Sequence, residues 1–187
     1  FNELRAVQRI NTLLNMGASL EEILTQVCTS IKEVYHYQFA YPLLLDPSLR
    51  FLTFDHVFVP DKLANRIRRA LGVDIKDFKY PISEDFSLFK TIRAKKCLIW
   101  QGFEEMIQEI PVEEISSALK TLSSDLSKAL GLKPGENSIM IAPLPYGEDV
   151  IGILFLGHRK SLTEEDFQHL EYFLDQVGIA IAKSEVE

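Results

Sequence analysis

Residues 138–184 decide the expected fold, and they read SIMIAPLPYGEDVIGILFLGHRKSLTEEDFQHLEYFLDQVGIAIAKS. Two apolar runs, residues 138–146 and 150–157, are joined by residues 147–149, which include a glycine. This spacing is typical of a β-hairpin. Two prolines in the first run predict that this strand lies at a sheet edge or carries a bulge, because proline has no N–H for the ladder.

A helix is predicted directly after the hairpin. Thr163 can cap its start, with Asp166 in the place of the usual glutamate of a capping box. Apolar residues then recur at spacings of three and four. They are Phe167, Leu170, Leu174, Val177 and Ile181. Such a stripe favours packing against a partner helix, and the alternative is that it packs on the sheet of its own domain.

The stretch from 138 to 184 resembles the C-terminal half of a GAF domain, the small-molecule-sensing domain of signalling proteins such as sensor histidine kinases. The resemblance implies an antiparallel sheet flanked by helices on both sides, with the N- and C-terminal helices packed together. It also implies a ligand between one sheet face and the central segment, and a homodimer formed through terminal helices.

The rest of the chain fits this order of elements. Ser19 and Glu22 form a capping box, Gly72 is a stop signal, and Pro111 interrupts a helical pattern. We expect an α+β fold and one domain over residues 1–187, with a helical insertion at about 103–131. The predicted helices are residues 3–16, 20–35, 61–71, 85–95 and 103–130, and the other predicted strands are residues 38–45, 51–59, 79–82 and 97–100.

The composition is that of an ordinary globular protein. The chain has 187 residues, of which 47% are hydrophobic and 25% charged, and its two cysteines cannot form a disulfide framework. Its apolar runs are shorter than the ~20 residues that cross a bilayer. A net charge of -7 argues against nucleic-acid binding. We expect no membrane contact by this segment, a cytoplasmic location, and, since the chain begins at Phe1, a piece of a longer polypeptide.

No catalytic motif is recognisable, so we expect no enzymatic activity. The histidines lack metal-ligand spacing, and no glycine-rich phosphate loop is present. A redox or haem sensor stays open as an alternative. His56 shares one side of a predicted strand with Phe54 and Phe58, and Cys97 follows two lysines that can lower a thiol pKa. Each of these residues also fits a purely structural role, and the sequence names no cofactor.

The resemblance places a ligand beside aromatic and aliphatic side chains of the central segment. Few polar groups accompany them, which suits a small organic ligand and also an ordinary core. Trp100, the only tryptophan, ends a strand next to the inserted helical region, where we expect it to border the cavity. The candidate ligand-binding residues are Phe54, Tyr80, Ile82, Phe86, Phe89, Trp100, Ser138 and Ile141, with Asn137 as a further polar candidate.

These observations predict a sensory domain of a larger signal-transduction protein that binds a small ligand and relays the signal through its terminal helices. The alternative is a domain without ligand that serves dimerisation and signal relay. Adjacent domains of the same chain and a second copy are the expected partners.

Overall fold

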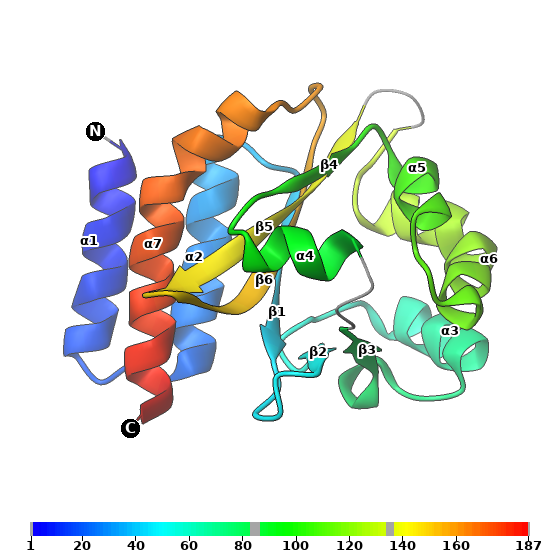
Figure 1. Cartoon of the computed structure of the whole chain (residues 1–187), viewed down its shortest axis with the longest axis horizontal. Coiled ribbons are helices and arrows are strands. Elements are labelled where there is room, and N and C mark those ends of the chain that lie inside the picture. Colours follow the sequence, from blue (N-terminus) through cyan, green and yellow to red (C-terminus); the bar gives the residue numbers. More distant parts are fainter. Residues whose placement is uncertain (1, 83–86, 134–136, 187) are drawn as a thin grey trace.

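A computed structural model of the chain describes residues 2–82, 87–133 and 137–186. A six-stranded antiparallel sheet forms its centre, with the strand order β3-β2-β1-β6-β5-β4 (Figure 1). The strands are β1 Phe39–Leu45, β2 Phe51–Thr53, β3 Lys79–Pro81, β4 Leu98–Trp100, β5 Ser138–Tyr146 and β6 Asp149–His158.

Helices cover both faces of this sheet, as the α+β prediction requires. In Figure 1, α1, α2 and α7 lie side by side on one face, while α3, α5 and α6 stand across the other. The helices are α1 Asn2–Asn15, α2 Leu20–Tyr35, α3 Asp61–Leu71, α4 Ser87–Arg93, α5 Phe103–Gln108, α6 Glu113–Ala129 and α7 Glu164–Val186, with a 3-10 turn at Ile75–Asp77. The N- and C-terminal helices α1 and α7 are in contact.

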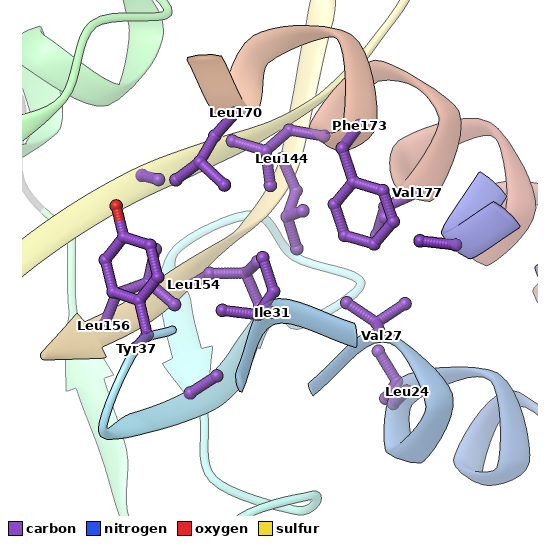
Figure 2. Packing of buried hydrophobic residues seen from close by; sticks show 14 of the residues in the cluster. Leu24, Val27, Ile31, Tyr37, Leu144, Leu154, Leu156, Leu170, Phe173 and Val177 are labelled. Carbon is purple, nitrogen blue, oxygen red and sulfur yellow. The ribbon is translucent and has the colours of Figure 1, made fainter. Parts of the chain in front are cut away.

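The main core lies between the sheet and the terminal helices. Side chains alternate along a strand, so every second residue of β5 and β6 points to this face. Figure 2 shows Leu144 and Leu154 of these strands against Phe173 and Val177 of α7, with Ile31 of α2 closing the layer. All five of these side chains are almost completely buried.

The apolar stripe of α7 is used within the chain. Phe167 is 6% exposed, and Leu170, Leu174, Val177 and Ile181 are each 1% exposed or less. These side chains pack against the sheet and against α1 and α2. The stripe therefore covers the sheet of its own domain, which was the alternative to packing against a partner helix. A contact with a second copy has to use another side of α7.

Local end signals act as predicted. The Ser19 hydroxyl accepts a hydrogen bond from the Glu22 N–H at 3.2 Å, which caps α2. Gly72 ends α3 in the left-handed region, at a φ of 80°, where its N–H donates to the Arg68 carbonyl. The Thr163 N–H donates to the Asp166 carboxylate at 2.9 Å at the start of α7.

The first strand of the final hairpin takes one of its two predicted forms. Strand β5 is not at the edge, because β4 pairs with its outer side, and the register instead shifts between Leu144 and Pro145. A bulge thus accommodates the proline that cannot donate to the ladder. The turn is one residue shorter than expected, since β6 already begins at Asp149.

The predicted strand at residues 51–59 is wrong beyond its third residue. Strand β2 ends at Thr53, and the Val57 N–H then donates to the Phe54 carbonyl, so the chain turns there. Phe58 is 57% exposed, while Val57 is buried. Phe54, His56 and Phe58 therefore do not share one side of a strand, because aromatic content alone does not distinguish a strand from an apolar loop that covers a core.

Candidate functional site

The second face of the sheet borders a cavity. Tyr41 and Leu43 of β1, Ile141 of β5, and Ile153 and Phe155 of β6 line it. Their neighbours along each strand point to the opposite face and join the core of the terminal helices. The cavity and the terminal helices thus lie on opposite faces of the same strands.

The opposite wall is a pair of helices that pack on each other. Leu63 and Ile67 of α3 form a small buried cluster with Leu122 of α6. Arg66 of α3 also forms an ion pair with Asp125 of α6. We call α3 and α6 together the helical cover, because they lie over the cavity and contact each other extensively.

Between the sheet and the helical cover lies a cavity of about 230 Å³. Its wall is almost wholly apolar. The helices contribute Leu63, Ile67, Leu71, Phe103, Met106, Ile115, Leu119, Leu122 and Leu126, and the sheet and loops contribute Tyr41, Leu43, Leu52, Phe54, Val57, Tyr80, Leu98, Trp100, Ile141, Ile153 and Phe155, among others.

One charged side chain, Glu109, is found among the described residues that line the cavity. It caps the C-terminus of α5, and its carboxylate oxygen Oε2 accepts a hydrogen bond from the indole Nε1 of Trp100. Trp100 is 6% exposed, whereas Glu109 reaches solvent. The pair therefore forms a polar end where the cavity approaches the surface.

Two phenols are the other polar side chains among the described residues of the wall. Burial raises the pKa of Tyr41 and of Tyr80 above the ordinary value, because a phenolate would lose its hydration. Both side chains stay neutral at physiological pH. A neutral phenol can donate one hydrogen bond and also accept one.

The structure brings together four of the residues that the sequence indicated. Phe54, Tyr80, Trp100 and Ile141 line the cavity. Ile82 packs behind the wall in the same apolar cluster. Phe89 stacks on the guanidinium of Arg93, with 4.6 Å between the guanidinium carbon and the ring centre. Phe86 lies outside the described residues.

Ser138 lies away from the cavity and connects three segments. It is fully buried at the start of β5, where its hydroxyl donates to Gln101 Oε1 at 2.8 Å. The Ser138 Oγ atom in turn accepts a hydrogen bond from the Leu162 N–H at 3.0 Å. Ser138 thus holds the segment before α7 against the end of β4. Asn137 bonds the Lys133 carbonyl and does not line the cavity.

The resemblance placed the ligand against the central segment, but the sequence reasoning named no residue of the helical cover, and not Glu109, as part of this site. The apolar face of α3 was visible in the spacing of Leu63 and Ile67, but spacing does not say which surface such a face covers. Glu109 resembled any helix-end acid. Only its position nine residues after Trp100, across the turn into α5, could have suggested the contact.

His56 lies in a second, more polar pocket of about 280 Å³. Asp55, Lys76 and Lys79 line this pocket together with Glu185 near the end of α7. The Nδ1 atom of His56 is buried and has no hydrogen-bond partner in the described part of the chain. His56 does not reach the apolar cavity.

The two cysteines are not activated. Burial raises the pKa of the Cys97 thiol to about 11, and the carboxylate of Glu164 contributes in the same direction. The neighbouring lysines thus do not produce the thiolate that the sequence left open. The pKa of Cys28 is likewise raised to about 11 by burial, and neither cysteine lines the cavity.

No group of three or more potential metal ligands occurs among the residues that the structure describes. Within the same ranges, none of the helices combines the length and the apolar character needed to cross a bilayer.

Comparison with known proteins assigns the family. The family model of the GAF domain matches residues 17–182, which is most of the chain. No curated protein matches the chain. The chain therefore belongs to the GAF domain family, a class of sensory and regulatory domains that are usually not catalytic.

Solved structures agree on the fold. The GAF domain of a phosphoenolpyruvate-protein phosphotransferase from Coxiella burnetii superimposes with a TM-score of 0.63 at 13% identity, covering 99% of this chain and 95% of that one. Residues 122 to 287 of a methyl-accepting chemotaxis protein give a TM-score of 0.60 at 17% identity, covering 97% of each chain. A phycoerythrobilin-bound GAF domain from a cyanobacterial phytochrome gives 0.59 at 16%, covering 100% and 97%.

Proposed function

We propose that this GAF domain binds a small molecule in the apolar cavity and relays the binding event through α1 and α7. It would act within a larger cytoplasmic signal-transduction protein, such as a histidine kinase of a two-component system. One observation carries the proposal: the cavity and the terminal helices occupy opposite faces of the same strands. We further propose that residues 1–187 form one non-catalytic domain, with residues 103–131 inserted to cover the cavity.

Strand β5 supplies the mechanical link. Ile141 lines the cavity, while its neighbours Met140 and Ala142 are fully buried on the face that α7 covers. A ligand that favours one position of β5 therefore also favours one packing of α7. The size of the effect equals the difference in ligand affinity between the two packings.

The binding residues that we propose are the wall residues Phe54, Tyr80, Trp100 and Ile141. Ile82 packs against the apolar cluster of the wall, and Ser138 fixes the segment that leads to α7. Phe89, which stacks on Arg93, stays a candidate from the sequence. This division follows from the positions above. Phe86 remains a candidate from sequence.

A domain without ligand that serves dimerisation and relay is the second candidate. It is favoured by the exposed apolar side chains Leu4 on α1 and Tyr172 and Ile179 on α7, which suit a homodimer through these helices. A redox or haem sensor has less support. The described cavity wall contains no histidine or cysteine, and the thiol pKa values are raised rather than lowered.

A thermal-shift screen against a metabolite library tests the proposal. A ligand present at about 100 times its Kd should raise the Tm by roughly 5–10 °C. The Leu119→Trp variant, whose larger side chain takes up part of the cavity, should lose the shift. Native mass spectrometry then gives the stoichiometry, and a visible absorbance spectrum detects a bound haem. The absence of any hit, with a dimer present, would favour the second candidate.

A further inference from the structure

The charges around the cavity discriminate against anions. Lysine, arginine and histidine are absent from the described wall, and Glu109 adds a negative charge at its polar end. Helix N-termini attract anions, but α3 begins with Asp61 and α6 with Glu113 and Glu114, whose carboxylates offset the positive end of each helix. A phosphate or carboxylate in the cavity would lose its hydration and would find no cation on the described wall, where the neutral phenols of Tyr41 and Tyr80 compensate only part of that loss.

The cavity volume restricts the size of the ligand. An apolar cavity of ~150 Å³ holds one benzene molecule, while pockets for drug-sized molecules start near ~300 Å³. At about 230 Å³, this cavity fits a molecule of one ring or two fused rings. The aromatic residues of the wall, such as Phe54, Phe155 and Trp100, suit a planar ring system.

The polar end adds a further requirement. Trp100 donates its only side-chain hydrogen bond to Glu109, so it has none left for a ligand. A carboxylate accepts up to about four hydrogen bonds, and Glu109 therefore retains capacity for a ligand that donates one.

Resting on the proposed function, we propose that the ligand is an uncharged molecule of one or two fused rings with a single hydrogen-bond-donating group. That group lies at Glu109, and the rings lie between the sheet and the helical cover. An uncharged donor is favoured over an ammonium group because, apart from Glu109, the described wall offers a cation only the neutral phenol oxygens of Tyr41 and Tyr80.

Three matched probes test this inference by titration calorimetry on the full chain: indole, 1-methylindole and indole-3-carboxylate. Indole has the N–H donor, 1-methylindole lacks it, and the carboxylate carries the anion. We expect indole to bind at least about tenfold more tightly than 1-methylindole, because a hydrogen bond to a charged group contributes about that factor. Indole-3-carboxylate keeps the N–H, and we expect it to bind more weakly than indole because its anion would lose hydration in the cavity.

Variants locate the effect. Glu109→Gln should weaken indole binding by about tenfold and leave 1-methylindole binding unchanged. The matched control is Glu104→Gln, an exposed position on the same helix that does not line the cavity. Leu119→Trp should abolish binding of all three probes. Unfolding curves of each variant establish that it is folded.

The inference about the ligand is wrong if indole-3-carboxylate binds as tightly as indole or more tightly, or if indole and 1-methylindole bind equally. Neither result contradicts the proposed function. Loss of indole binding in Glu104→Gln, with Glu109→Gln unaffected, overturns the inference as well. If no probe binds, the inference fails, and the metabolite screen decides the proposed function. If compounds from the screen bind the wild type and not Leu119→Trp, the proposed ligand-binding function stands. If the screen gives no hits, that function is rejected.

Discussion

Gly178 determines how closely α7 approaches the sheet. It lies in the middle of the helix, and a Cβ atom at this position would collide with the carbonyl oxygen of Pro145. That oxygen belongs to the backbone of β5, so a change of side-chain rotamer cannot relieve the collision. The helix therefore contacts the backbone next to the β-bulge at Gly178, where the helix has no side chain.

We predict that Gly178→Ala destabilises the domain. Alanine favours an isolated helix by ~1 kcal/mol over glycine, but overpacking at a rigid contact costs typically ~1–3 kcal/mol. The free energy of unfolding in urea should therefore fall. Glu171→Ala, at an exposed position of the same helix, should change it little. A gain in stability for Gly178→Ala would show that the helix and strand are not in contact there.

Asp166 makes the start of α7 sensitive to acid. Burial alone would raise the pKa of its carboxyl, but Lys160 Nζ donates to it at 2.6 Å and the Thr163 N–H at 2.9 Å, and these donors lower the pKa below its ordinary value. A lowered native pKa contributes stability above the unfolded pKa, and that contribution is lost as the pH falls.

Asp166→Asn should therefore destabilise the domain by about 1 kcal/mol at pH 7, and the difference from the wild type should disappear as the pH falls below about 4. Urea unfolding at a series of pH values measures the difference. Asp175→Asn, on an exposed part of α7, serves as the control. A difference that stays constant down to pH 2.5 would contradict the linkage.

At the scale of elements, we expect the helical cover to move independently of the sheet. Its buried contacts join α3 to α6 through Leu63, Ile67 and Leu122, whereas the sheet side of the cover faces the cavity. Contacts of this kind allow a segment to open without unfolding the rest of the domain.

Hydrogen exchange should show this difference. We predict that amides of α3 and α6 exchange together and faster than those of β5 and β6, and that Leu122→Ala increases exchange in the cover alone. Leu170→Ala, which removes a buried side chain from the other core, should instead increase exchange throughout the domain. Equal protection of the cover and the central strands would contradict this prediction.

Local signals allowed most elements to be predicted from sequence. Ser19 with Glu22, Gly72 and Pro111 mark helix ends through backbone hydrogen bonds and dihedral preferences that act over a few residues. The two apolar runs of residues 138–157, separated by a glycine-containing turn, predicted the central hairpin for the same reason. These features depend little on the rest of the chain.

Predictions that needed long-range information were less complete. The run from Phe54 to Phe58 is apolar enough for a strand, yet the chain turns there, and Phe54 and Val57 pack in the apolar cluster of the cavity wall. Four candidate residues line the cavity, but the helical cover and Glu109 could not be placed there. Which surface an amphipathic helix covers depends on contacts far apart in the chain, and local spacing does not encode them.

At the scale of the whole molecule, the terminal helices present apolar side chains to solvent. Tyr172 is 54% exposed and Ile179 36% exposed, and seven residues of helix place them on one side of α7. Leu4 on the neighbouring helix α1 is 55% exposed. These positions remain free for a contact because the buried stripe of α7 lies on the opposite side.

We predict a homodimer through this side. Sedimentation at high micromolar concentration should show a dimer, and the double variant Tyr172→Glu with Ile179→Glu should shift it to monomer. Tyr146→Glu, an exposed apolar residue at the end of β5, should leave the dimer intact. If the wild-type chain sediments only as a monomer, the dimer prediction is wrong, and any relay has to take place within one copy of the domain.

The alternation of side chains along the central strands also has a consequence for how such a domain can diverge. In β5 and β6, Ile141, Ile153 and Phe155 face the cavity, while Met140 and Leu154 face the terminal helices. Neighbouring codons therefore encode side chains with separate roles. Natural selection can change ligand specificity at one position and leave the packing of the terminal helices at the next position unchanged. Descendants of one ancestral gene could thus come to answer different molecules while still driving the same downstream domain.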